Sequence, residues 1–133
     1  MGLKRLAHVG FAVGEMEPAR QFFSDVLAAE VSEAVTDPTQ KVQVCFARFD
    51  GGTVELVAPA GPGSPVDAVL KKGRGCYHLC FETDDLEAEI TRLRGHGFLP
   101  TASPAAAVAF GGRRICFLYS RQGRLIELVE AAC

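Results

Sequence analysis

The 133-residue chain predicts an α+β fold in which two tandem βαβββ modules form a curved mixed sheet around a cleft. Two pairs of similar segments carry this prediction. Residues 6–13 read LAHVGFAV and residues 76–83 read CYHLCFET, while residues 53–58 read TVELVA and residues 125–130 read LIELVE. Similarity at a nearly fixed spacing is typical of a duplicated structural unit.

The first half begins with a strand at residues 4–13 and continues with an amphipathic helix at residues 17–29. Apolar residues recur in that helix at three- and four-residue spacing. They are Ala19, Phe22, Phe23, Val26 and Leu27. Pro18 suits the first helical turn, where its missing N–H costs no hydrogen bond. Strand-like stretches follow at residues 31–35, 41–49 and 53–57, and a turn at residues 50–52 joins the last two.

The second half repeats this order of elements. A strand at residues 76–83 leads into a helix that Asp84 or Asp85 can cap by accepting hydrogen bonds from its free N–H groups. The buried stripe of that helix consists of Leu86, Ile90 and Leu93, and Gly95 or Gly97 ends it. The strands expected next span residues 98–102, 114–119 and 124–129, with a turn at residues 121–123 in the final hairpin.

We expect a single domain over residues 1–133, with one module at about 1–60, a linker at 61–75 and a second module at about 76–133. The linker region is rich in Pro and Gly and contains one short helix, which Ser64 caps, Pro65 opens and Gly73 ends. A chain of this length suits one compact domain or two small modules that share a core.

The composition argues against several classes of partner. Hydrophobic residues make up 48% of the chain and charged residues 23%, as in ordinary globular proteins. The net charge of −2 gives no electrostatic basis for binding nucleic acid or an anionic membrane. Five cysteines without an export signal favour reduced thiols, and therefore a cytoplasmic location.

Two histidines and two glutamates recur in the same order in the two halves. His8 and His78 are 70 positions apart (78 − 8), and Glu55 and Glu127 are 72 apart (127 − 55). Because side chains alternate across a strand, all four are expected on the faces opposite the helices, where two duplicated sheets would direct them into one cleft. Buried carboxylates are costly unless paired or bound to metal, and mixed nitrogen and oxygen ligands suit a divalent cation. We therefore expect these four residues to bind a metal.

Each of these residues also has a simpler interpretation. A lone strand histidine is often a hydrogen-bonded core residue, but repetition in matching contexts favours the metal site. Cys76 and Cys80 could join His78 as soft zinc ligands, although neither glutamate would then be explained; we expect both thiols to line the cleft as small apolar groups. His96 lies among glycines at a helix end, where it is expected to be exposed or to cap the helix.

The chain resembles the vicinal oxygen chelate superfamily, which includes glyoxalases, bleomycin resistance proteins and dioxygenases, and within it the methylmalonyl-CoA epimerases. The segments that carry the resemblance are HVGFAV, VELVAPAGPGSPVDAVLKKGRG, YHLCFETDDLEA and ICFLYSRQGRLIELVE. The resemblance implies that His8, Glu55, His78 and Glu127 bind one divalent cation such as Co, Mn, Ni or Zn. It also implies a homodimer.

The sequence departs from the epimerase pattern at three places. VAFGGRR stands where a Gly-rich loop with a histidine is common, and Tyr119-Ser120 replaces a His-Pro pair. Some epimerases have a second catalytic glutamate on the third strand of the first module. Here that region offers Gln43, or Val44 in a stricter alignment.

The resemblance implies metal-dependent proton transfer at a carbon next to a carbonyl or thioester, with a small-molecule substrate such as an acyl-CoA. Glu127 is then the base as well as a ligand, and Glu55 would have to serve on the opposite face. Five basic residues could hold a phosphorylated carrier or simply form a solvated surface: Lys71, Lys72, Arg74, Arg113 and Arg114. Two other functions stay open: another lyase or isomerase of a biosynthetic intermediate, and a metal-free small-molecule (antibiotic) binding protein.

Overall fold

The computed structural model describes residues 3–73, 75–121 and 124–132. The chain divides into two compact units. The first unit comprises residues 8–77, and the second comprises residues 1–7 together with residues 78–133. Strand β1 (Leu3–Ala12) contributes to both units, because residues 3–7 belong to the second unit and the rest of the strand to the first.

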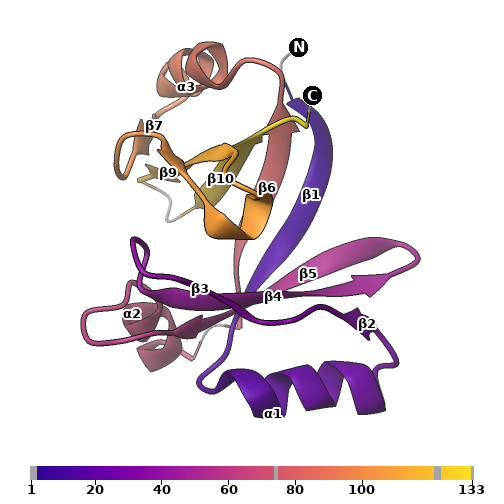
Figure 1. Cartoon of the computed structure of the whole chain (residues 1–133). Coiled ribbons are helices and arrows are strands. Elements are labelled where there is room, and N and C mark those ends of the chain that lie inside the picture. The colour runs from indigo at the N-terminus through magenta and orange to yellow at the C-terminus, as the bar shows by residue number, and fades with distance from the viewer. Residues whose placement is uncertain (1–2, 74, 122–123, 133) are drawn as a thin grey trace. The chain divides into compact units, whose positions relative to one another are not determined.

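The first unit is a mixed sheet with a helix against one face (Figure 1). Its elements after β1 are α1 (Met16–Gln21), the π-helical turn η1 (Phe22–Val26), β2 (Glu30–Val31), β3 (Val35–Asp37), β4 (Val42–Phe49), β5 (Gly52–Pro59) and α2 (Val66–Lys71). Strand β5 pairs in parallel with β1 on one side and antiparallel with β4 on the other. The two short strands β2 and β3 pair antiparallel with β4.

The core of the first unit lies between the α1–η1 helix and the sheet. Buried Phe23 packs there with Leu56 of β5 and with residues of β4. Only part of the predicted apolar stripe is buried, since Phe22, Val26 and Leu27 are all exposed. A π-helical turn is wider than an α-helical turn, so three- and four-residue spacing no longer keeps side chains on one face.

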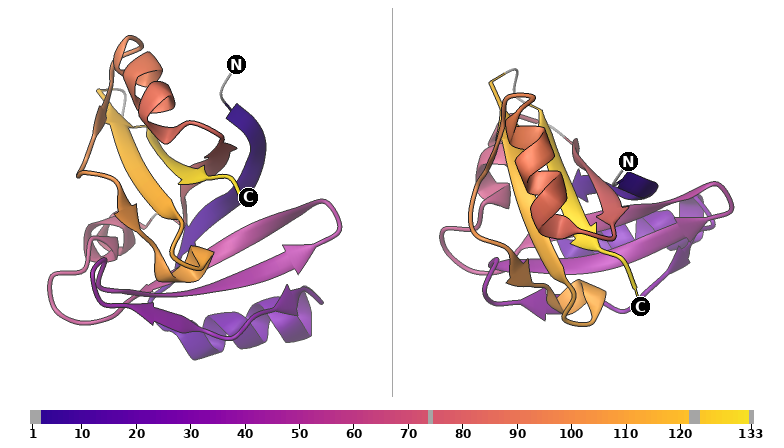
Figure 2. Two further views of the ribbon diagram at one scale, coloured as in Figure 1. Left: turned by 45° about the horizontal axis from the view of Figure 1, so that its top comes forward. Right: turned by 90° about the horizontal axis from the view of Figure 1, so that it is seen from above.

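The second unit has the same plan. Its elements are β6 (Cys76–Thr83), α3 (Leu86–Arg94), β7 (Phe98–Pro100), β8 (Ala105–Ala106), a 3-10 turn η2 (Val108–Phe110), β9 (Arg114–Ser120) and β10 (Leu125–Glu130). Strand β10 pairs in parallel with β6 and antiparallel with β9, and β7 and β8 pair antiparallel with β9. Helix α3 packs on this sheet (Figure 2).

The core of the second unit is the contact between α3 and one face of its sheet. The three predicted residues, Leu86, Ile90 and Leu93, are buried and pack on Leu118 and Leu128. The predicted cap is also confirmed, because the Asp85 carboxylate accepts a hydrogen bond from the Ala88 N–H at 3.0 Å, and Gly95 follows the last turn.

Residues at the start of the chain contribute to this second unit. Leu3 packs against its core, and Lys4 and Arg5 form ion pairs with Asp84 and Glu82, each at 3.1 Å. The first strand of the chain therefore stabilises the unit built from the C-terminal half.

The α+β prediction with a repeated βαβββ order and a mixed sheet is confirmed. The strand predicted at residues 31–35 is wrong as a single element. The Ser32 side chain accepts the Phe46 N–H at 2.8 Å, which separates β2 from β3. Part of the predicted turn at 121–123 lies outside the described residues, and the module boundaries near residues 60 and 75 stay a prediction. None of the helices described is long and apolar enough to cross a membrane.

Candidate active site

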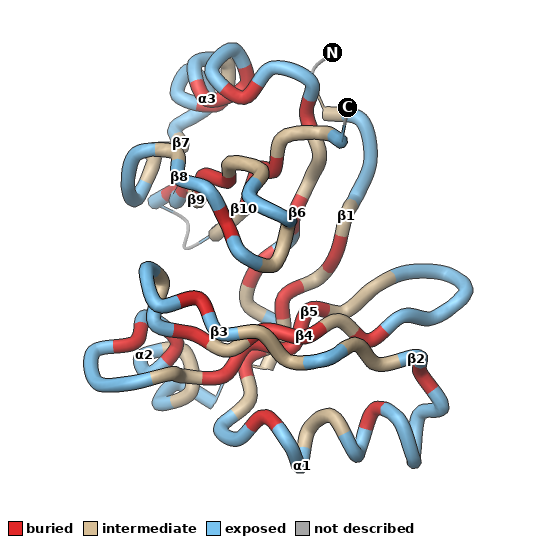
Figure 3. The backbone as a smooth tube through the Cα atoms, viewed as in Figure 1, coloured by how far each residue is buried: buried red, intermediate tan, exposed pale blue. Residues whose placement is uncertain are grey.

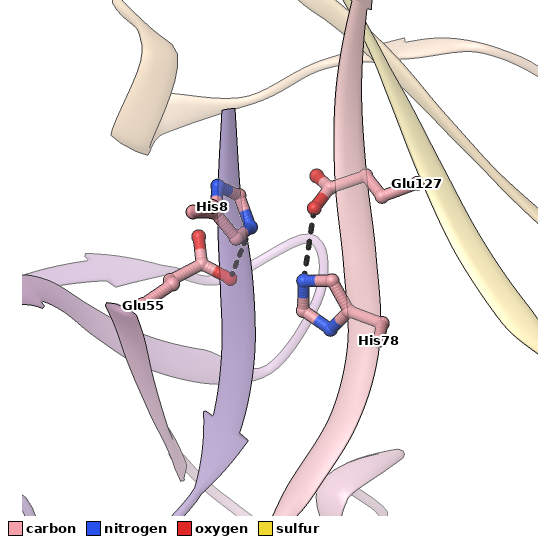
Figure 4. Close-up of side chains that lie close together, drawn as sticks. All are labelled: His8, Glu55, His78 and Glu127. Atoms are coloured by element: carbon pink, nitrogen blue, oxygen red, sulfur yellow. Dashed lines mark ion pairs between the residues drawn. The ribbon is translucent and has the colours of Figure 1, made fainter. Parts of the chain in front are cut away.

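The first histidine–glutamate pair lies between the parallel strands β1 and β5. In their register Glu55 is opposite Gly10, two residues beyond His8 on the same face of β1. The Nε2 atom of His8 lies 3.3 Å from Oε1 of Glu55 (Figure 4), and the two side chains are only 1% and 7% exposed. The structure therefore brings these two predicted side chains together in a buried position.

The second pair has the same geometry within the second unit. Strands β6 and β10 are parallel, and Glu127 is opposite Cys80, again two residues beyond the histidine. His78 Nε2 lies 3.1 Å from Glu127 Oε1, with exposures of 0% and 2% (Figure 4). The same offset between strands gives the same pair in both units.

A phenylalanine contacts each imidazole, and the sequence analysis did not identify it. In the antiparallel register Phe46 is opposite Glu55, and Phe117 is opposite Glu127. The Phe46 ring lies 5.7 Å from the His8 ring at 60°, and the Phe117 ring lies 5.2 Å from the His78 ring at 87°. Such edge-to-face contacts are favourable.

The signal for these aromatic residues was present in the sequence. A Cys-Phe dipeptide occurs at residues 45–46, 80–81 and 116–117, and the first and the last are 71 positions apart (116 − 45). That spacing lies between the spacings of the two histidines and the two glutamates. The repeat is therefore a trio of His, Phe and Glu rather than a pair.

The donor atoms of each pair fit a divalent cation. Each pair supplies an imidazole nitrogen and a carboxylate oxygen, and a carboxylate removed from water needs a cationic or hydrogen-bonding partner. Imidazole and carboxylate together suit manganese, cobalt, nickel or zinc. The chemistry of both pairs is thus compatible with the predicted metal.

Comparison with known proteins identifies the family. The profile of a family described as "Glyoxalase/Bleomycin resistance protein/Dioxygenase superfamily" matches residues 7–117. The chain belongs to this superfamily. Members of the superfamily similar to the chain include two named epimerases. One is the mitochondrial methylmalonyl-CoA epimerase of Mus musculus, 35% identical over 133 residues that cover 97% of this chain and 74% of that protein.

The second relative is the ethylmalonyl-CoA/methylmalonyl-CoA epimerase of Cereibacter sphaeroides, 33% identical over 130 residues, with 95% of this chain and 97% of that protein covered. A solved methylmalonyl-CoA epimerase in complex with methylmalonyl-CoA and NH4+ superposes with a TM-score of 0.84 at 27% identity. The superposition covers 98% of this chain and 96% of the other. Within the superfamily the protein is therefore epimerase-like.

The strand register decides which residue of β4 shares a face with Glu55. Val44 is opposite Val57, two residues along from the pairing of Phe46 with Glu55, so Val44 lies on the Glu55 face. Gln43 is opposite Ala58 and therefore lies on the other face, toward the α1 core. Of the two residues considered for a second base, only the non-ionisable Val44 is on the side of the pair.

Of the other polar candidates, Cys80 lies beside the second pair, opposite Glu127 in the register of β6 and β10. Cys80 is buried in an apolar cluster with Ala107, Ile115 and Val129, as expected of a thiol that fills space. Cys45, Cys76 and Cys116 have free thiols. His96 is exposed.

The five basic residues considered for a phosphorylated carrier separate into three groups. Arg114 forms ion pairs with Glu87 and Glu130, each at 2.8 Å, and Arg113 donates to the Glu130 carbonyl at 2.9 Å. Both therefore stabilise the end of β10. Lys71 and Lys72 are exposed at the end of α2, and Arg74 lies outside the described residues.

Proposed function

We propose that this protein is a metal-dependent epimerase that moves a proton at the carbon between the carboxylate and the thioester of a 2-alkylmalonyl-CoA, methylmalonyl-CoA above all. One observation carries the proposal: a chain with epimerase relatives retains two buried His–Glu pairs in equivalent strand positions. The acyl-CoA substrate follows from the relatives and from the complex with methylmalonyl-CoA.

The proposal assigns His8, Glu55, His78 and Glu127 as ligands of one divalent cation. The repeat and the burial of all four side chains support this assignment. A bound cation supplies Lewis-acid stabilisation of the negative charge that develops on the thioester oxygen during proton removal.

The carboxylates of the chain move the proton. Glu127 takes it from the substrate carbon, since an ionised carboxylate within hydrogen-bond reach is a competent general base. Glu55, as the carboxylic acid, gives a proton to the carbon from the opposite face, because β4 presents Val44 rather than a carboxyl group beside it. The proposal therefore uses one glutamate from each unit.

The two phenylalanines restrict water at the pairs. Phe46 and Phe117 each contact the imidazole of their unit and lie beside its glutamate. Exclusion of water strengthens the electrostatic interactions of the carboxylates and fixes the ring orientations.

The deciding experiment is deuterium exchange. Metal-reconstituted protein is incubated in D2O with one epimer of 2-methylmalonyl-CoA, and the product is analysed by mass spectrometry and by optical activity. We expect incorporation of solvent deuterium at the acidic carbon together with loss of optical activity, and no reaction after chelation of the metal. Protein that binds metal but exchanges no deuterium would rule the proposal out.

The proposal also includes a homodimer in the cytoplasm, as predicted from the sequence. Sedimentation velocity tests the assembly, and a single monomer boundary at micromolar concentration would contradict it.

A further inference from the structure

Arg48 lies next to the first His–Glu pair on the same face of β4. It is two residues beyond Phe46, and side chains two apart in a strand share a face. Its guanidinium carbon lies 5.4 Å from the centre of the Phe46 ring, and that ring contacts His8. One aromatic ring thus separates an exposed cation from the buried pair.

The guanidinium of Arg48 has no carboxylate partner among the described residues, although Glu30 is its neighbour across β2 and β4. Two other arginines of the chain are engaged in hydrogen bonds and ion pairs. Arg20, in the same unit, bonds the Glu17 carboxylate and the Ser32 carbonyl, and Arg114 bonds two glutamates. Arg48 therefore keeps its hydrogen-bond donors available for a ligand.

The equivalent position in the second unit carries a different group. Tyr119 is two residues beyond Phe117, as Arg48 is two residues beyond Phe46, and it is 51% exposed. The buried His and Glu and the partly buried Phe are the same in both units, whereas the exposed residue two positions after the Phe is a cation in one and a phenol in the other. The guanidinium beside the first pair therefore has no equivalent beside the second pair.

We propose that Arg48 binds an oxyanion of the substrate, held in place by stacking on Phe46. A guanidinium offers a planar set of donors that matches a carboxylate or a phosphate, and stacking on an aromatic ring leaves the N–H edge free. The inference rests on the proposed function for its ligand. An acyl-CoA of a dicarboxylic acid carries two sources of this chemistry, the free carboxylate and the phosphates of the carrier.

The test compares Arg48→Met with Arg94→Met. Arg94 is an exposed arginine in the last turn of α3, and α3 packs on the sheet face opposite to that of Glu127. We expect Arg48→Met to raise KM for 2-methylmalonyl-CoA about 10-fold, the effect of one charge-assisted hydrogen bond, with little change in kcat. Arg94→Met should match the unchanged protein, and Arg48→Lys should recover part of the loss. Equal KM values for the two methionine variants would overturn the proposal.

A truncated thioester without phosphates identifies the source of the oxyanion. If Arg48→Met raises KM for the methylmalonyl thioester of N-acetylcysteamine as well, the carboxylate is the ligand. If the effect is confined to the CoA thioester, the phosphates are. Both results support the proposal, and they show whether Arg48 binds the carboxylate or the phosphates.

Direct binding keeps this inference separate from the proposed function. Calorimetry measures the affinity of the unchanged protein and both methionine variants for 2-methylmalonate and for free CoA, which requires no turnover. Weaker binding by Arg48→Met alone supports the role of Arg48 even if no epimerisation is found. Equal affinities in all three proteins, or no binding of either ligand by the unchanged protein, would overturn it.

Discussion

The two units of this protein place the same three residue types, His, Glu and Phe, at equivalent strand positions. They differ at the exposed position two residues after the Phe. In each, a histidine on one strand and a glutamate on the parallel neighbour are brought together with an offset of two residues. An antiparallel third strand then places a phenylalanine opposite the glutamate. The buried chemistry is duplicated, and the adjoining exposed position is not.

The His and Glu residues that the two units share are buried, and the residues that differ between them two positions after the Phe are exposed. Red segments in Figure 3 mark the buried residues, which include all four members of the His–Glu pairs. By contrast, Arg48 and Tyr119, at equivalent positions, are both exposed. The residue type at an exposed position can differ between duplicated units, because packing in the core does not restrict it. The following predictions test how far the equivalence of the two units extends.

The largest expected effect separates the two glutamates. Glu127→Gln should lower the rate of deuterium exchange by more than the roughly 10²- to 10⁴-fold typical of general acid–base catalysis, since an amide accepts no proton and also binds metal weakly. Glu55→Gln should lower the rate of deuterium exchange less than Glu127→Gln does if Glu127 is the principal base. Exchange into a 2-methylmalonyl thioester measures both. Equal losses, or a more severe defect at Glu55, would contradict the assignment.

The two histidines should be equivalent in metal binding. His8→Ala and His78→Ala should each weaken the affinity for cobalt or zinc by more than the roughly 10- to 100-fold cost of losing an outer-shell partner. Calorimetric titration of the metal measures this, and elemental analysis should find about one divalent ion per chain of the unchanged protein. The exposed His96 provides the control, His96→Ala. An affinity unchanged in His78→Ala would make that residue a core histidine.

The phenylalanines test whether the aromatic contact matters in both units. Phe46→Leu and Phe117→Leu should each lower kcat/KM by about 3- to 10-fold, the worth of one aromatic contact. In the metal-free protein the imidazole NMR signals of the same unit should shift, because a nearby ring current is lost. Phe49→Leu and Phe98→Leu are the matched controls on β4 and on β7. Unmoved imidazole signals in Phe46→Leu would contradict the contact.

The smallest expected effect concerns the end of β10, which the ion pair between Arg114 and Glu130 stabilises. Hydrogen bonds from Arg114 hold the pKa of Glu130 below its ordinary value of 4.5. Because the pKa is lower in the folded state, the stabilisation is present above pH 4.5 and is lost as the pH falls further. Glu130→Gln should therefore lower Tm by a few degrees at most at pH 7, and the difference should shrink in acid. A difference independent of pH would contradict the ion pair.

The sequence by itself determined the repeat, the α+β class and the four polar residues of the pairs. Each of these depends on local pattern. His8 and His78 lie in apolar strand segments of similar composition, and Glu55 and Glu127 share a Glu-Leu-Val context. Alternation along a strand then assigns each side chain to a face without knowledge of its neighbours.

The buried side of the first helix shows where local pattern fails. Apolar spacing in the sequence correctly predicted an amphipathic helix, yet Phe22 and Val26 are exposed because the helix continues as a π-helical turn. Leu79 alternates with His78 along β6, which assigns it to the helix-covered face of that strand, yet it is 40% exposed. The length and position of a covering helix are not encoded in the strand that it covers.

Only the tertiary structure decided what lies beside each pair. Whether Gln43 or Val44 shares the face of Glu55 depends on the register between β4 and β5, and a shift of one residue would exchange them. The contact of Phe46 with His8, which lies on β1, depends on the same register. Register is set by the pairing of strands across the sheet. The sequence therefore identified the reactive side chains, and the strand pairing determined which residues lie beside them.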